Sequence, residues 1–191
     1  MRAVHGLPLA AALALSGLAT AALAQSSLPN GASALSETYG DWQIACQVVE
    51  PPKDGPDAKA AAKRLCALAQ VQREQKSHML VFSAEIRVPD PKSDKVAATF
   101  VLPFGIAVTE PIAVNADGKD LAPLKVTTCL PVGCVVPAVP VEAAAVAALA
   151  GGKPLTVATR DTAGRGISFE LRPDGFAEGL KRLRALEATP N

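Results

Sequence analysis

The stretch VTTCLPVGCVV, residues 126–136, holds two cysteines with four residues between them. Apolar and β-branched residues lie on both sides, and Pro and Gly between the cysteines are typical of a tight reversal between two strands. A disulfide between Cys129 and Cys134 would fasten such a turn at its base. We therefore interpret the stretch as the stapled tip of a hairpin that begins near Leu121, with β-structure on either side.

Alternating apolar and polar residues predict strands elsewhere in the chain. In residues 42–48, WQIACQV, every second residue from Trp42 onward is apolar, as in a half-buried strand. Pro103 interrupts an apolar run, and we expect the strand to resume after it in FGIAVT, residues 104–109. Asp117-Gly118 between two apolar runs predicts another hairpin. Further strands are expected at 64–72, 80–88, 96–102, 154–160 and 166–171.

Two segments carry helical patterns. Residues 141–150, VEAAAVAALA, are rich in Ala and Leu, and Gly151 follows as a stop. Near 174–187 apolar residues recur at helical spacing, at Phe176, Leu180, Leu183 and Leu186. This spacing predicts a C-terminal helix with one face docked on a sheet. The expected fold class is mainly β, with antiparallel strands and two short helices.

The N-terminus has the pattern of an export signal. Arg2 precedes an apolar stretch, residues 7–19, and Ala22-Leu23-Ala24 fits the small-x-small pattern of a cleavage site. We predict that residues 1–24 are a cleaved signal peptide and that Gln25, after Ala24, is the first mature residue. The apolar run is interrupted by polar residues, and no basic residue follows it until Lys53, so no transmembrane anchor is expected in the mature chain.

The rest of the chain is expected to form one domain. Residues 25–38 lack periodicity and predict a flexible lead, so that order begins near Tyr39 and a single disulfide-stapled β domain spans 39–191. Residues 50–63 combine Pro with charge and predict a solvated loop. Loops at 50–64, 89–95 and 160–166 are the natural candidates for contacts, although no binding residue is identified within them.

Charge excludes one class of partner. The chain has 19 basic and 18 acidic residues, and loss of Arg2 with the signal leaves 18 of each. A formally neutral chain without a basic patch offers no global field for nucleic acid or for an anionic membrane. An unidentified protein or envelope component is the expected partner.

The four cysteines all follow the export signal, and an oxidising compartment favours disulfides. Three pairings are possible. We favour Cys46 with Cys66 and Cys129 with Cys134, because both close local loops. A redox role for Cys129 and Cys134 is the alternative, although redox sites of the thioredoxin type place C-x-x-C at a helix N-terminus.

Other catalytic or metal chemistry has little sequence support. A zinc site needs two closely spaced cysteine pairs, and Cys46 lies too far from Cys66 in sequence to form one. His78 is the single histidine of the predicted mature chain, so any hydrolytic triad would depend on it. We interpret it as a solvated turn residue. No catalytic residue, cofactor or metal ligand is therefore expected.

Six segments along the chain form a distinctive series. They are GDWQIAC at 40–46, Cys66-Ala67-Leu68 followed by Gln70, LPFGIAV at 102–108, VNADGK at 114–119, TTCLPVGCVV at 127–136, and Gly175-Phe176. Together they resemble the invasion associated locus B family of exported bacterial proteins. The resemblance implies a β-sandwich-like exported domain, found in the periplasm, the outer envelope or the medium. In pathogenic relatives it implies a link to host-cell invasion. The family pattern supplies no catalytic residue, so we expect a non-enzymatic envelope or secreted interaction protein.

Overall fold

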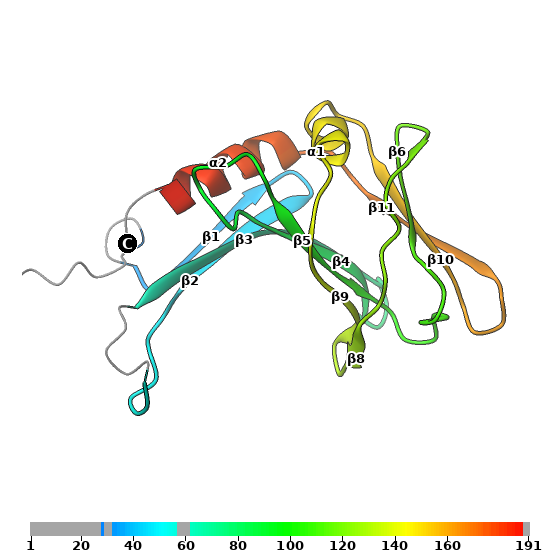
Figure 1. The fold of residues 1–191 in the computed structure, drawn as a ribbon, viewed down its shortest axis with the longest axis horizontal. Helices are drawn as coiled ribbons and strands as arrows, with labels where there is room; N and C mark the ends of the chain where they lie inside the picture. The colour runs from blue at the N-terminus through cyan, green and yellow to red at the C-terminus, as the bar shows by residue number, and fades with distance from the viewer. Residues whose placement is uncertain (1–27, 29–31, 57–61, 189–191) are drawn as a thin grey trace, which may run out of the picture.

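The computed structural model describes residues 28, 32–56 and 62–188, which form two antiparallel sheets and two helices (Figure 1). The larger sheet has seven strands in the order β1-β2-β3-β4-β5-β9-β8. They are β1 Ala34–Tyr39, β2 Trp42–Val49, β3 Lys63–Arg73, β4 Leu80–Arg87, β5 Ala97–Leu102, β8 Thr128–Leu130 and β9 Gly133–Pro140. The mainly β, antiparallel and sandwich-like fold expected from the sequence is confirmed.

The smaller sheet has four strands in the order β11-β10-β6-β7. They are β6 Ala113–Ala116, β7 Lys119–Asp120, β10 Leu155–Arg160 and β11 Gly166–Leu171, and the helices are α1 Ala143–Ala150 and α2 Phe176–Ala188. Both expected helices are therefore present. Asp117-Gly118 forms the turn between β6 and β7, as expected, with positive φ at both residues.

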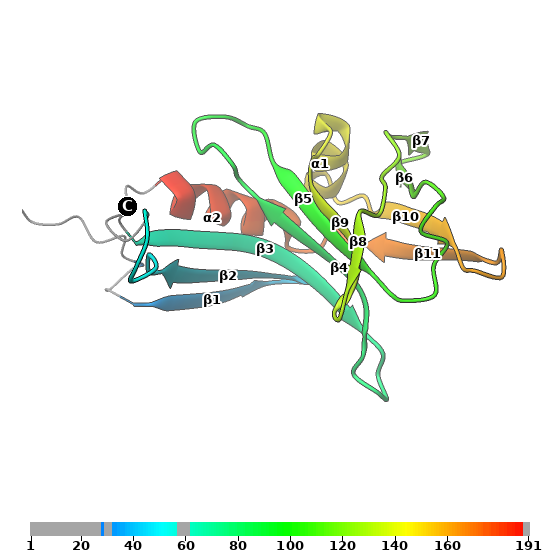
Figure 2. The same ribbon diagram turned by 60° about the horizontal axis from the view of Figure 1, so that its bottom comes forward.

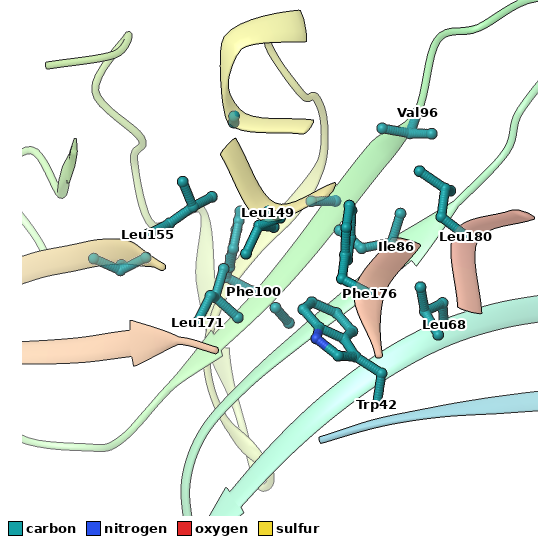
Figure 3. Close-up of a cluster of buried hydrophobic side chains, with 14 of the residues drawn as sticks. Trp42, Leu68, Ile86, Val96, Phe100, Leu149, Leu155, Leu171, Phe176 and Leu180 are labelled. Carbon is teal, nitrogen blue, oxygen red and sulfur yellow. The ribbon is translucent and has the colours of Figure 1, made fainter. Parts of the chain in front are cut away.

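One face of the seven-stranded sheet is covered by α2, and we call it the covered face. Along β2 every second side chain from Trp42 to Cys46 is buried, as the alternation predicted. The apolar stripe of α2 packs there: Phe176, Leu180, Leu183 and Leu186 are all buried. The rings of Trp42 and Phe176 meet edge to face with centroids 5.0 Å apart (Figure 3). The predicted docking of the C-terminal helix is confirmed.

The two sheets are joined through aromatic stacking and one buried amide. Phe169 of β11 stacks on Phe82 of β4, with ring centroids 4.9 Å apart. Gln70 of β3 is 0% exposed, and its amide accepts from the Arg172 N–H at 3.1 Å and donates to the Arg172 carbonyl at 2.9 Å. Trp42 Nε1 donates to the same carbonyl at 2.8 Å. The Gln70 side chain thus pairs with the end of β11 as a neighbouring strand would.

Order begins earlier than the sequence predicts. The expected flexible lead through Thr38 is wrong for residues 34–38, because β1 pairs with β2 over its full length. As an edge strand, β1 is fixed by backbone hydrogen bonds and by the ion pair of Glu37 with Arg182, which need no apolar periodicity. The predicted signal peptide 1–24 and its cleavage site at Ala24 and Gln25 lie outside the described residues.

Two further expectations need correction. The strand does not resume after Pro103, because Phe104-Gly105 turns the chain, and Ile106 forms only an isolated bridge with Asp161 at the edge of the smaller sheet. The stapled hairpin begins at Thr128 rather than near Leu121, because the segment from Leu121 still pairs with the smaller sheet. The Leu121 N–H donates to the Val114 carbonyl, and Leu124 forms a bridge with Ile112.

Candidate binding surface

The second face of the seven-stranded sheet is partly exposed to solvent along β2–β5, and we call it the open face. In Figure 2 these strands run side by side, with β8 and β9 following at their far edge. The face is defined by the side chains that alternate with the buried ones. They are Gln43, Ala45, Gln47, Val49, Lys63, Leu65, Ala67, Ala69, Val71, Arg73, Ser83, Glu85, Arg87, Ala97, Thr99 and Val101, none of them buried.

The open face is half apolar although it is in contact with water. Solvated faces of antiparallel sheets are usually polar, whereas eight of these sixteen residues are alanine, valine or leucine. Glu85 and Arg87 are the charged residues at its middle, and they pair with each other, with Arg87 Nε 2.5 Å from Glu85 Oε1. Beside them lies a shallow hollow of about 230 Å³, lined in part by Ala45, Leu65 and Ala67.

At one end of this face the stapled turn is held against β5. Leu102, the last residue of β5, lies opposite Cys134, and Cys129 lies opposite Cys134 on the other side. Gly133 has φ +140°, and a Cβ there would approach the Leu102 carbonyl oxygen to 2.5 Å and a Val101 methyl to 2.8 Å. Only glycine permits this approach, so the turn is fixed to β5 by shape as well as by the disulfide.

The turns at this end present large apolar side chains to solvent. The β3–β4 turn, the turn after β5 and the β8–β9 turn are neighbours because the strands they join are adjacent and antiparallel (Figures 1 and 2). Their exposed residues are Met79 at 64%, Phe104 at 62%, Val132 at 54% and Leu130 at 48%. We call these four residues the apolar end.

Exposed apolar side chains are concentrated on the open face and at the apolar end. In the described ranges eight large hydrophobic residues are exposed, and all but Val108 belong to the open face or to the apolar end. The three on the open face are Val49, Leu65 and Val71. Single exposed hydrophobic residues are ordinary, but a contiguous group indicates an interaction surface.

The cysteines lie at two different sites. Cys46 and Cys66 face each other across β2 and β3 on the covered face, both buried, with an S–S distance of 2.03 Å. Cys129 and Cys134 lie across β8 and β9, at an S–S distance of 2.00 Å. Both expected pairs are thus at disulfide distance. Cys129 is exposed while Cys134 is only 2% exposed.

His78 occupies the β3–β4 turn and is exposed, with a positive φ of 56°. Its carbonyl accepts from Arg73 Nη1 at 3.1 Å. The hydroxyl of the adjacent Ser77 donates to the carboxylate of Glu74. These contacts fold the turn and bring no nucleophile to the imidazole.

The three loops suggested as contact sites carry none of the exposed large hydrophobic residues that the structure describes. Residues 57–61 of the first loop lie outside the description. In the loop 160–166, Asp161 accepts from the N–H groups of Ala163 and Arg165 and from Arg165 Nε. The backbone hydrogen bond from Arg165 contributes most to lowering the pKa of Asp161 below its ordinary value. The loop is also tied to the turn after β5, because the Thr162 N–H donates to the Gly105 carbonyl at 2.9 Å. Contact by these loops stays a prediction.

The apolar end was missed in the sequence because its residues belong to three separate segments, of which 126–136 was interpreted as a stapled turn and 104–109 was predicted to be a strand. One signal was available: Phe104, Leu130 and Val132 are large apolar residues directly beside Pro or Gly in turns, where polar residues are usual. That the turns adjoin one another follows from strand order, which the sequence did not supply.

The fold and surface define a small, disulfide-stapled, sandwich-like β domain with an exposed apolar surface. No helix in the described ranges is long and apolar enough to cross a membrane. The family model for the invasion associated locus B (IalB) protein matches residues 42–184. The chain belongs to the invasion associated locus B family, as its motifs suggested.

Named relatives agree with this assignment. An invasion protein B homologue of Brucella abortus strain 2308 is 33% identical over 161 residues, which cover 84% of this chain and 85% of the relative. Invasion protein B of Bartonella bacilliformis is 32% identical over 164 residues, covering 84% and 80%. The crystal structure of invasion associated protein B from Bartonella henselae matches with a TM-score of 0.65 and 27% identity, covering 80% of this chain and 97% of that one.

Proposed function

We propose that this chain is an exported, non-enzymatic interaction protein of the periplasm, outer envelope or medium, and that its apolar end binds a protein partner. The observation that carries the proposal is the grouping of four exposed apolar side chains on adjacent turns. A tip that stays rigid when free loses little conformational entropy on binding, and so retains more of the free energy of burying apolar surface.

Two further observations support the stapled turn as the centre of the contact. The Gly133 approach to Leu102 and the bridge between Cys129 and Cys134 fix the turn that presents Leu130 and Val132. Their side chains therefore contribute to binding rather than to the core. Residues at the well-packed centre of an interface, from which water is excluded, commonly carry much of its binding energy.

The biological setting is proposed from the relatives. Two relatives are named invasion protein B or a homologue of it. By that likeness, we propose that the partner lies on the surface of a host cell when the bacterium that makes the protein is invasive. In other bacteria the same surface would bind an envelope protein.

In-cell photo-crosslinking tests the proposal. A photoreactive amino acid in place of Val132 is expected to yield a discrete crosslinked adduct, in the producing bacterium or on contact with host cells. The matched control places it at Lys92, an exposed position in the β4–β5 turn at the opposite end of the strands, and is expected to yield none. Loss of the adduct on adding Phe104→Asp would support the apolar end as the site, and equal labelling from both positions would contradict it.

A thiol-disulfide role for Cys129 and Cys134 is the second candidate, favoured by one observation. Exchange needs an accessible sulfur, and Cys129 is exposed while its partner is buried. Titration of the thiols in graded glutathione buffers tests this role. A reduction potential above about −300 mV would favour redox chemistry, and a lower one would leave a structural bridge.

A further inference from the structure

The open face has an order of side chains along β3 that reads nearly the same in both directions. Leu68 lies opposite Ile86 in the middle of β3 and β4. Ala67 and Ala69 lie one residue to either side of Leu68, and two residues further lie the exposed Leu65 and Val71. About the row formed by Leu68 and Ile86, β3 therefore presents on the open face a small residue and then a large aliphatic residue in each direction.

On β4, by contrast, the residues on the two sides of the same row carry opposite charges. Glu85 and Arg87 lie one residue to either side of Ile86 and both belong to the open face. Reversing the strand direction therefore exchanges a carboxylate with a guanidinium. A surface whose opposite charges are exchanged on reversal is electrostatically complementary to a reversed copy of itself.

We propose that two copies of this chain pack open face against open face, about a two-fold axis that runs across the strands along the Leu68–Ile86 row. The axis places each strand over its own counterpart in the opposite direction. Val71 of one copy then lies over Leu65 of the other, and Glu85 of each copy faces Arg87 of the second.

Sheet packing favours this arrangement. Two sheets stacked face to face lie about 10 Å apart, and small residues allow that approach. The paired charges meet in a region from which water is excluded, where complementary ion pairs select the register of the two copies. With a formal net charge of +1 per chain, long-range repulsion between copies is weak. Lys63 and Arg73 meet only at the rim, where solvent screens them.

The dimer leaves the apolar end free. The axis reverses strand direction, so the stapled turns of the two copies lie at opposite ends of the pair and each remains open to a partner. This inference therefore goes beyond the proposed partner binding and does not depend on it. Two linked sites on one particle would raise the apparent affinity for a surface that displays many partners.

Sedimentation equilibrium of the purified, oxidised protein tests the dimer. The wild-type chain is expected to dimerise reversibly, and Leu65→Asp or Val71→Asp to raise the dimer dissociation constant at least about tenfold. Val132→Asp, a matched substitution at the apolar end, is expected to leave it unchanged. Thermal unfolding verifies that each variant is folded. A wild-type protein that stays monomeric at about 0.1 mM, or a Val132→Asp variant that alone loses dimerisation, would overturn the proposal.

A charge exchange separates the interface from ordinary surface effects. Glu85→Arg is expected to weaken the dimer about tenfold or more, and Glu85→Arg with Arg87→Glu to restore it. When differently tagged proteins are mixed, the double variant is expected to pair with itself and not with wild type, because Glu85 would then face a glutamate. Free mixing of the double variant with wild type would overturn the proposal. Crosslinking from position 132 reports on partner binding separately.

Discussion

The covered and open faces belong to the same strands, but one is buried beneath α2 and the other is exposed to solvent. On the covered face, Trp42 and Leu68 are fully buried beneath α2. On the open face the alternate positions include Leu65 and Val71, whose side chains remain exposed. Apolar residues thus occupy both faces of β3. Only those on the covered face stabilise the fold by removing apolar surface from water.

The difference shows which residues the fold requires. Removing an apolar side chain from the covered face leaves a cavity, whereas removing one from the open face removes a surface already in water. Stability alone therefore explains Trp42 but not Leu65 or Val132. Matched substitutions on the two faces test whether stability depends on the covered face alone.

The largest effect is expected from Phe176→Ala on the covered face. Its ring meets Trp42 and is 1% exposed, so the deletion should lower the free energy of unfolding by about 3 to 5 kcal/mol. Leu65→Ala on the open face should change it by less than about 0.5 kcal/mol. Urea unfolding followed by tryptophan fluorescence measures both. Comparable losses from the two variants would contradict the division between the faces.

The next largest loss of stability is expected from removing each disulfide in turn. Cys46 and Cys66 are separated by 20 positions, and Cys129 and Cys134 by 5. In the chain-entropy model their removal as alanine pairs costs about 3 and about 2 kcal/mol, because the longer loop restricts the unfolded chain more. Only the second removal should also weaken crosslinking at the apolar end.

Peptide mapping without reduction checks the pairing that underlies this prediction. It should yield one linked peptide containing Cys46 with Cys66 and another containing Cys129 with Cys134. A linkage between Cys46 and Cys129 would overturn both the pairing and the expected order of effects.

A buried amide and an exposed one provide a third, smaller test. Gln70→Met on the covered face removes both hydrogen bonds to the Arg172 backbone and leaves its N–H without that partner, at a cost of about 1 to 3 kcal/mol. Gln43→Met on the open face loses an exposed bond to Ser36 and should change stability by less than about 0.5 kcal/mol. Thermal melts of the two variants, compared at one pH, show whether the amides differ as expected.

Much of the covered face could be predicted from the sequence. Alternation at 42–48 placed Trp42 inside, and helical spacing placed Phe176 and Leu180 on the docked face of α2. These signals are local, since each depends on the period of one element. Gln70 was not predicted to be buried, because its partner Arg172 is 102 residues away and becomes adjacent only when the two sheets meet.

The open face and the apolar end were less accessible to prediction. In β3 both alternating series contain aliphatic residues, so the pattern could not say which series α2 covers. β1 was missed because an edge strand held by its backbone needs no apolar period. The apolar end depends on the order of β4, β5, β9 and β8, in which the chain leaves the sheet after β5 and returns at β8. Such adjacency is a property of topology rather than of composition.

The smallest effect is expected at the sheet edge, where Glu37 of β1 meets α2. Its carboxylate accepts from Arg182 Nε at 2.8 Å, Arg182 Nη2 at 2.7 Å and the Tyr39 hydroxyl at 2.8 Å. The hydrogen bonds from Arg182 chiefly lower the pKa of Glu37 below its ordinary value of 4.5. Because the pair is partly exposed, Glu37→Gln should cost only about 0.5 to 1 kcal/mol at neutral pH.

The stability difference between wild type and Glu37→Gln should depend on pH in a defined direction. A carboxylate whose pKa is lowered by folding stabilises the native state fully above its unfolded pKa, and that contribution is lost as the pH falls through the folded pKa. The stability gap between wild type and Glu37→Gln should therefore be constant above pH 4.5 and narrow below it. Glu50→Gln, at an exposed carboxylate outside the strands, is the control and should show no comparable gap. A gap for Glu37→Gln that widened on acidification would mean that the contact of β1 with α2 is not an ionic one.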